Sequence, residues 1–241
     1  MTDRLRITQA HRAYNSNAGL FGASLAVAAG EIHALGGRNG AGKTTLMRAI
    51  IGMLRLSSGT ILLNGLPVER VSADQWRQVG HLIDHPFAYP ELTTRANVEL
   101  ASRLRGIPPA DIPSKVESVL AELELDTYAE VPTRRLSQGN LQRLGLAVAL
   151  HHDPELIVLD EPTNALDPAG VILVREALIT RSLKEAGVLV SSHHLDEVAR
   201  IADQISVVNR GRVIAKLDPS CTDLERRFFQ LVYADEERNP A

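Results

Sequence analysis

The sequence of 241 residues is poor in cysteine, in aromatic residues and in long apolar runs. It has one cysteine, Cys221, so no internal disulfide can form, and such low thiol use is typical of a reducing compartment. The longest apolar run, LGLAVAL at 144–150, is far below the roughly 18 residues of a membrane span. These absences exclude a disulfide-stapled scaffold, and they predict that any membrane role requires a partner.

The chain also lacks an excess of basic charge. It has 26 Lys and Arg residues against 29 Asp and Glu residues, whereas a nucleic-acid binder usually has a basic excess or a clustered basic stripe. The N-terminal segment MTDRLRITQAHRAY alternates polar and apolar residues and has no apolar core of a secretory signal. We therefore expect a cytoplasmic chain that does not bind nucleic acid.

The composition itself is that of a globular protein, with 44% hydrophobic and 23% charged residues. Apolar strands that alternate with helices predict a parallel sheet covered on both faces, and segments of alternating polarity near the N-terminus predict a hairpin-like antiparallel sheet. The expected strands are 4–10, 22–28, 31–35, 60–65, 156–160, 187–192 and 204–209, and the expected helices of the core are 43–53, 169–186 and 195–202.

The middle of the chain differs from both ends because it has helical patterns and almost no strand pattern. Two such patterns, 95–105 and 114–125, are separated by a proline-containing stretch. We interpret 1–241 as a single domain into which a helical subdomain, 85–153, is inserted. The last residues, 233–241, are expected to form a flexible tail.

The segment GRNGAGKT matches the phosphate-binding motif G-x-x-x-x-G-K-[ST]. Its glycines let the backbone bend close to phosphate oxygens, the lysine reaches the β and γ phosphates, and the threonine hydroxyl is a ligand for Mg²⁺. An apolar segment precedes the motif and a helical pattern follows it, as the motif requires. The expected binding residues are Gly37, Asn39, Gly40, Ala41, Gly42, Lys43, Thr44 and Thr45.

A second signal is LIVLDEP, which places Asp160 and Glu161 at the end of a buried strand. Nucleotide sites form at this edge of a parallel sheet. We expect Asp160 to support the Mg²⁺ shell and Glu161 to polarise the attacking water, because phosphoryl transfer depends mostly on positioning and charge stabilisation. A solvated strand end is the alternative, but it explains poorly the four apolar residues before the pair and Pro162 after it.

A third signal is LSQGN at 136–140, a small polar element before a helical apolar pattern. Backbone N–H groups at the start of a helix attract anions, so Ser137, Gln138 and Gly139 are candidates for a second phosphate cradle. This element has no lysine, and the first cradle lies far earlier in the chain. The residues alone therefore leave open which phosphate it holds.

Four segments in this order and spacing resemble the ATP-binding subunits of ABC transporters: GRNGAGKTTL, LSQGN followed by LQRLGLAVAL, LIVLDEPTNALDP and SSHHLDEV. The resemblance covers about Leu5 to Tyr233. It implies an α/β P-loop NTPase fold with a RecA-like parallel-sheet core, an antiparallel β subdomain and a helical insert. It also implies an ATPase coupled to transmembrane transport, with ATP and Mg²⁺ as cofactors.

In that family, the signature loop of one subunit closes over the ATP held by the phosphate loop of another. The resemblance therefore implies that Ser137, Gln138 and Gly139 bind the nucleotide of a second copy. It implies a homodimer of ATP-binding subunits that acts with a separate transmembrane permease. The chain would then be peripheral on the inner face of the cell membrane and would contact the membrane only through that permease.

Further positions are assigned from the resemblance. Tyr14 stands where the family has a stacking aromatic, although a tyrosine packed at a strand end is an equal alternative without the family context. His193 resembles the switch histidine that contacts the γ phosphate, so we count it with Glu161 as catalytic. For His194 a passive role is expected. The segment Asn164 to Asp167 resembles the loop through which the two subunits communicate.

One loop, VGHLIDHPFAYPELT, departs from the family because Asp84 stands where a glutamine is usual. It resembles the bacitracin-export and lantibiotic-immunity branch, whose loop has a carboxylate. The likeness implies export of an antimicrobial peptide or drug. It also implies that Asp84 contacts the metal, with water between them if the shorter side chain requires it. The alternative is a loop aspartate without a metal contact.

Two other classes of protein share these motifs. ATPases of DNA maintenance carry a long coiled-coil or zinc-bearing insert, whereas fewer than a hundred residues separate Thr44 from Ser137 here, with one cysteine and no heptads. Soluble regulatory or translation-associated ATPases with two fused cassettes would carry two sets of motifs, and this sequence has one. A transporter subunit is therefore the favoured interpretation.

Overall fold

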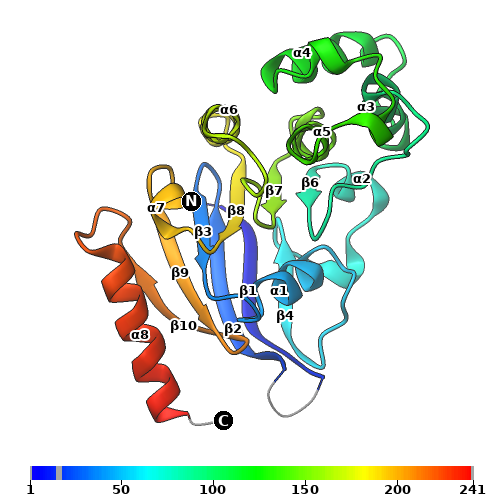
Figure 1. Cartoon of the computed structure of the whole chain (residues 1–241). Coiled ribbons are helices and arrows are strands. Elements are labelled where there is room, and N and C mark those ends of the chain that lie inside the picture. The colour runs from blue at the N-terminus through cyan, green and yellow to red at the C-terminus, as the bar shows by residue number, and fades with distance from the viewer. Residues whose placement is uncertain (1, 15–17, 240–241) are drawn as a thin grey trace.

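The computed structural model describes residues 2–14 and 18–239, and its central feature is a six-stranded sheet (Figure 1). The strand order is β10-β9-β3-β8-β7-β6; β10 is antiparallel to β9 and the remaining neighbours are parallel. The strands are β3 Ile32–Gly36, β6 Val79–Leu82, β7 Leu156–Leu159, β8 Gly187–Ser192, β9 Gln204–Asn209 and β10 Arg212–Leu217.

A second sheet is antiparallel, has the order β2-β1-β4-β5, and includes the predicted N-terminal hairpin. Asn64 and Gly65, both with positive φ, form the turn between its last two strands. Helix α1, Lys43–Ile50, packs in the same hydrophobic cluster as this sheet and one face of the parallel sheet. The four strands are β1 Asp3–Ala13, β2 Gly19–Ala28, β4 Ser58–Leu63 and β5 Leu66–Pro67.

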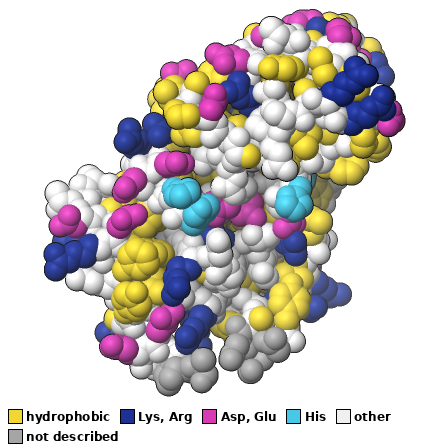
Figure 2. Space-filling view, in the orientation of Figure 1, with side chains coloured by type: hydrophobic (Ala, Val, Ile, Leu, Met, Phe, Trp, Pro, Cys, Tyr) yellow, Lys and Arg dark blue, Asp and Glu magenta, His cyan; other side chains and the backbone are white. Residues whose placement is uncertain are grey.

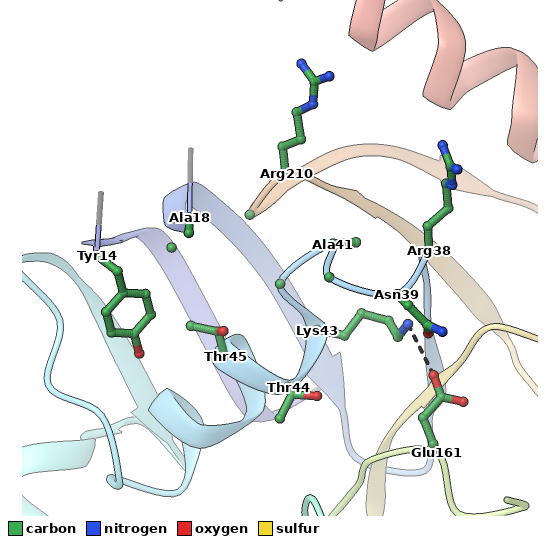
Figure 3. Close-up of a pocket in the computed structure, with 14 residues that line it drawn as sticks. Tyr14, Ala18, Arg38, Asn39, Ala41, Lys43, Thr44, Thr45, Glu161 and Arg210 are labelled. Atoms are coloured by element: carbon green, nitrogen blue, oxygen red, sulfur yellow. Dashed lines mark ion pairs between the residues drawn. The ribbon is translucent and has the colours of Figure 1, made fainter. Parts of the chain in front are cut away.

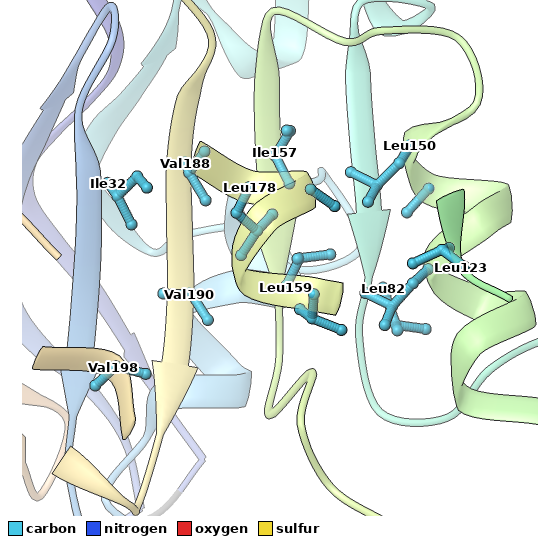
Figure 4. Close-up of a cluster of buried hydrophobic side chains, with 14 of the residues drawn as sticks. Ile32, Leu82, Leu123, Leu150, Ile157, Leu159, Leu178, Val188, Val190 and Val198 are labelled. Atoms are coloured by element: carbon cyan, nitrogen blue, oxygen red, sulfur yellow. The ribbon is translucent and has the colours of Figure 1, made fainter. Parts of the chain in front are cut away.

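Both faces of the parallel sheet are buried, which explains why its strands are continuous apolar runs. Successive side chains of a strand point to opposite faces. In β7, Ile157 and Leu159 pack with Leu178 of helix α6, Pro168–Ser182 (Figure 4). Leu156 and Val158 pack instead in the cluster that contains α1. The sheet is therefore held between two hydrophobic layers, and its strand ends keep a defined position.

The stretch 85–153 contains three long helices beyond the β6 edge of the parallel sheet (Figure 1). Leu82 of β6 packs in one hydrophobic cluster with Leu123 and Leu150, which joins these helices to the core (Figure 4). Within the described ranges, no helix of the protein is long and apolar enough to cross a membrane. These helices are α3 Thr94–Leu104, α4 Ile112–Glu122 and α5 Gln138–Leu150; α2 Ala73–Trp76 and α7 Leu195–Ala199 are short.

The C-terminus differs from the expectation of a flexible tail over 233–241, because helix α8, Leu224–Arg238, continues through most of that segment. Phe228 and Val232 are buried one turn apart and pack with the core cluster that includes the parallel sheet. Asp235 accepts a 2.8 Å hydrogen bond from Nδ2 of Asn209. Because the residues near the C-terminus are mostly charged, the sequence pattern does not predict this packing. Residues 240–241 of the expected tail lie outside the described residues.

Candidate active site

The phosphate-binding motif forms the loop between β3 and α1. Gly40 and Gly42 have φ values of +79° and +104°, in the left-handed region that glycine adopts without strain. A Cβ atom at Gly42 would lie 3.0 Å from Cα of Gly211, so the backbone of the β9–β10 turn would have to shift to admit a side chain. The amide of Gly211 also donates a 2.7 Å hydrogen bond to the carbonyl of Ala41. The loop is thus shaped by glycine and anchored to the neighbouring turn.

A cavity of about 260 Å³ lies beside this loop and is lined by residues 39–45, Glu161 and Tyr14, among others (Figure 3). Tyr14 directly follows β1 and is 54% exposed, which favours a binding role over packing at the strand end. Arg38 points away from Lys43, toward α8, and forms an ion pair of 3.9 Å with Glu236 (Figure 3). The cavity therefore combines an exposed aromatic ring with a glycine-rich, lysine-containing wall.

Lys43 is nearly buried, with its side chain 6% exposed, and its ammonium group has two partners. Nζ donates a 2.6 Å hydrogen bond to the carbonyl of Gly37 and forms a 3.2 Å ion pair with Oε1 of Glu161 (Figure 3). A buried ammonium requires such partners because desolvation is costly. A nucleotide phosphate that reaches Lys43 must therefore compete with the Glu161 carboxylate.

Asp160 is held between Thr44 and Ser191. The hydroxyl of Thr44 donates a 2.5 Å hydrogen bond to Oδ2, and the hydroxyl of Ser191 donates one of 2.5 Å to Oδ1. The Ser191 oxygen also accepts from the amide of Glu161 at 2.9 Å. Mg²⁺ in nucleotide sites takes one or two carboxylates together with phosphate oxygens, so the Thr44 and Asp160 oxygens fit such an ion.

Ser191 was missed by the sequence analysis. It is the penultimate residue of β8, in the segment GVLVSS, and β8 pairs in parallel with β7, whose last residue precedes Asp160. The one available signal was a polar pair at the end of an otherwise apolar strand.

Glu161 and His193 come together across the ends of β7 and β8. Oε2 of Glu161 lies 2.8 Å from Nδ1 of His193 and accepts a 3.2 Å hydrogen bond from the His193 amide. The ring of His194 lies beside that of His193, with centroids 4.0 Å apart. Acidic and histidine side chains gather in the hollow between the core and the helical region (Figure 2). The structure thus places the two residues assigned as catalytic in direct contact.

Asp84 has a φ of +66° and faces helix α1. Its carboxylate accepts two hydrogen bonds from Arg48, of 2.9 Å from Nε and 2.7 Å from Nη2. Hydrogen bonding to Asp84, opposed by slight desolvation, raises the pKa of Arg48 above its ordinary value. Asp84 also lines a second cavity, of about 510 Å³, together with Thr44, Asp160 and Glu161. The sequence analysis did not identify Arg48 as the partner of this carboxylate.

The signature residues start helix α5. Ser137 is its N-cap, and the hydroxyl oxygen accepts a 3.2 Å hydrogen bond from the amide of Asn140. Gln138 lines the second cavity, whereas Ser137 and Gly139 line neither cavity. A Cβ atom at Gly139 would lie 2.9 Å from the carbonyl of Ala165, so this glycine lets the 164–167 loop pack against the signature.

A glycine-rich loop with a lysine, a threonine–aspartate pair and a strand-end glutamate beside a histidine define a P-loop nucleotide hydrolase. A family model described as ABC transporter matches residues 20–164. The chain therefore belongs to the ABC transporter family and is an ATP-binding, ATP-hydrolysing subunit. This confirms the family, the fold and the enzyme class predicted from the sequence, and it favours transport over DNA maintenance.

Three similar proteins illustrate the relationship. The lantibiotic transport ATP-binding protein SrtF of Streptococcus pyogenes is 31% identical over 97% of this chain and 100% of its own length. The bacitracin transport ATP-binding protein BcrA of Bacillus licheniformis is 32% identical over 99% of this chain and 78% of its own. A solved ATP-binding subunit of an ABC transporter has a TM-score of 0.82 at 30% identity, covering 95% of this chain and 94% of that one.

Proposed function

We propose that two copies of this chain form a homodimer that powers a separate transmembrane permease from the cytoplasmic face of the membrane. The observation that carries the proposal is that Ser137 and Gly139 lie outside the cavity of their own Lys43. The N–H groups at the start of α5 are an anion site that a second copy can supply. Relatives named for lantibiotic and bacitracin transport support export of an antimicrobial peptide or drug as the cargo class.

Within each site, Tyr14 stacks on the base, and Lys43 and the loop amides hold the phosphates. Thr44 and Asp160 hold Mg²⁺, which when bound neutralises charge that develops on the phosphates. Glu161, displaced from Lys43 by the incoming phosphate, accepts a hydrogen bond from the attacking water. His193 holds the Glu161 carboxylate, and from this position it would contact the γ phosphate of a bound nucleotide.

The 164–167 loop supports communication between the two sites. Asp167 caps helix α6 by accepting a 2.9 Å hydrogen bond from the Gly170 amide, and it accepts another of 2.9 Å from Arg143 of the signature helix α5. These hydrogen bonds lower the pKa of the Asp167 carboxyl. Because the same loop packs on Gly139, a movement of the signature toward a partner's nucleotide moves this loop as well.

An exposed aromatic pair supports a permease contact. Phe87 and Tyr89 follow Asp84 in the same loop, are 73% and 46% exposed, and pack edge-to-face with centroids 5.2 Å apart. Exposed aromatic residues of this kind are typical anchors of protein interfaces. The loop that carries a site residue would thus also carry the contact to the membrane partner.

A mixing experiment tests the shared site. Lys43→Ala removes the phosphate ligand and Gly139→Asp places a carboxylate in the signature, so each variant alone should have lost ATPase activity. Mixed in equal amounts, they should recover up to about a quarter of the wild-type rate, because half of random dimers are mixed and each keeps one intact site. Absence of recovery together with a monomeric mass in light scattering would refute the homodimer. Unchanged nucleotide affinity of Lys43→Ala would refute the phosphate-loop assignment.

A further inference from the structure

The contact between Arg48 and Asp84 is a planar two-point contact between a guanidinium and a carboxylate. Arg48 lies on α1, the helix that begins at the phosphate loop, whereas Asp84 lies in the loop that follows β6. The charge of Asp160 also acts on Arg48, so this arginine lies near the acidic wall of the site. The ion pair between Arg48 and Asp84 therefore links helix α1 to the loop that contains Phe87 and Tyr89.

A carboxylate at this position needs a cation, because Asp84 shares its cavity with two other carboxylates, Asp160 and Glu161. Like charges close together are unfavourable unless a positive group lies between or beside them. Arg48 supplies that charge. A neutral glutamine could not reproduce this contact with two acceptor oxygens, since its amide nitrogen is a donor.

The pair is also weak enough to open. The side chains of Arg48 and Asp84 are 45% and 35% exposed. Solvent-exposed ion pairs of this kind contribute little to the free energy of unfolding. Asp84 has a left-handed backbone conformation, which aspartate tolerates at some cost in conformational energy. A change to an ordinary backbone conformation would remove that cost. An exchange of partners by Asp84 is therefore a small change in free energy.

We propose that Arg48 is a positioning residue that holds the Asp84 carboxylate at the rim of the active site and that the Mg²⁺-nucleotide complex competes with it for this carboxylate. The inference rests on the proposed function, because it assumes that the ion binds beside Thr44 and Asp160. Its consequence is that nucleotide binding loosens the Asp84 loop from α1 and frees the following aromatic pair to move with a membrane partner.

The first test measures hydrogen exchange of the backbone amides of residues 84, 85, 87 and 88 in the full chain. Without nucleotide, Arg48→Gln and Asp84→Asn should each raise the exchange rates by about two- to five-fold, the range of an exposed ion pair. Combining both changes should add little, because either one removes the same contact. Arg55→Gln, which removes an exposed positive charge shortly after α1, should leave these rates unchanged. Unchanged exchange in Arg48→Gln would overturn the positioning role.

The second test titrates Mg²⁺ against binding of a fluorescent ATP analogue, in a double-mutant cycle. Arg48→Gln should tighten the apparent Mg²⁺ affinity about two- to five-fold more when Asp84 is present than in the Asp84→Asn background. The comparison cancels the general effect of removing one positive charge. Arg48→Lys, which keeps the charge but lacks the planar fork, should fall between wild type and Arg48→Gln.

Equal effects of Arg48→Gln in the two backgrounds, or a weaker Mg²⁺ affinity that depends on Asp84, would overturn the competition. These outcomes differ from a failure of the proposed function. If Lys43→Ala abolishes nucleotide binding and the mixing experiment restores activity while the cycle is additive, only the inference about Arg48 is wrong.

Discussion

Glu161→Gln probes the contact that Glu161 makes with Lys43 and His193. In the structure, the two carboxylate oxygens are divided between the Lys43 ammonium at 3.2 Å and Nδ1 of His193 at 2.8 Å. Glutamine has nearly the same shape but no charge, so it keeps the packing and removes the anion. Two effects follow: the nucleotide-free protein loses an ion pair, and the attacking water loses the group that polarises it.

The size of the first effect follows from the geometry. For unit charges 3.2 Å apart and an effective dielectric constant of about 20, the attraction is about 5 kcal/mol as an upper bound. The side chains are 6% and 17% exposed, so solvent screens the pair little, but Gly37 still accepts a hydrogen bond from Lys43 and the neutral amide costs less to bury. We expect a net loss of about 1–3 kcal/mol in the free energy of unfolding without nucleotide.

ATP should bind about tenfold more tightly or better in this variant, because the phosphate no longer displaces a carboxylate from Lys43. Hydrolysis should fall by about 10²- to 10⁴-fold. The assays are urea unfolding without nucleotide, binding of a fluorescent ATP analogue, phosphate release, and light scattering with Mg²⁺ and ATP, which should report a dimer. Glu176→Gln, an exposed position on α6, is the matched control and should behave as wild type. A Glu161→Gln variant that stays monomeric and hydrolyses ATP at the wild-type rate would refute the catalytic assignment.

Three further predictions concern neighbouring residues. Asp84→Asn should reduce Mg²⁺-dependent turnover more than ATP binding, as measured by phosphate release against analogue affinity; an unaffected steady-state rate would contradict this. Ser191→Ala should lower the free energy of unfolding by about 1–3 kcal/mol in urea, because Oδ1 of Asp160 and the amide of Glu161 both lose a buried partner. Burial lowers the pKa of His151 to about 4. Below pH 6.5 the unfolded chain therefore binds more protons than the folded protein. The contribution of His151 to the free energy of unfolding, present above pH 6.5, is lost as the pH falls toward 4, by at most about 3 kcal/mol. Burial also lowers the pKa of His152, to about 2. His151→Gln should therefore remove up to about half of this dependence in urea unfolding at pH 7 and pH 4.5, and an unchanged dependence would show that other groups cause it.

The sequence by itself determined the features that local chemistry requires. Gly40 and Gly42 are needed by a loop with positive φ at both positions, and the run LIVL before Asp160 is needed by a strand buried on both faces. Each requirement acts on a few adjacent residues, so spacing and residue type are enough to identify the phosphate loop, the strand-end carboxylates and the parallel sheet. Hydrophobic periodicity likewise placed the helices between β6 and β7.

Only the tertiary structure decided which distant groups meet. Parallel pairing of β7 with β8 brings Ser191 to Asp160 and His193 to Glu161, and the position of α1 brings Arg48 to Asp84. The tertiary structure also determines that α8 continues to Arg238. Burial of Phe228 and Val232 against the core stabilises the helix despite the charged residues near its end. Pairings of this kind depend on sheet order and on burial across long sequence separations, and neither is encoded in the residues next to the ones that pair.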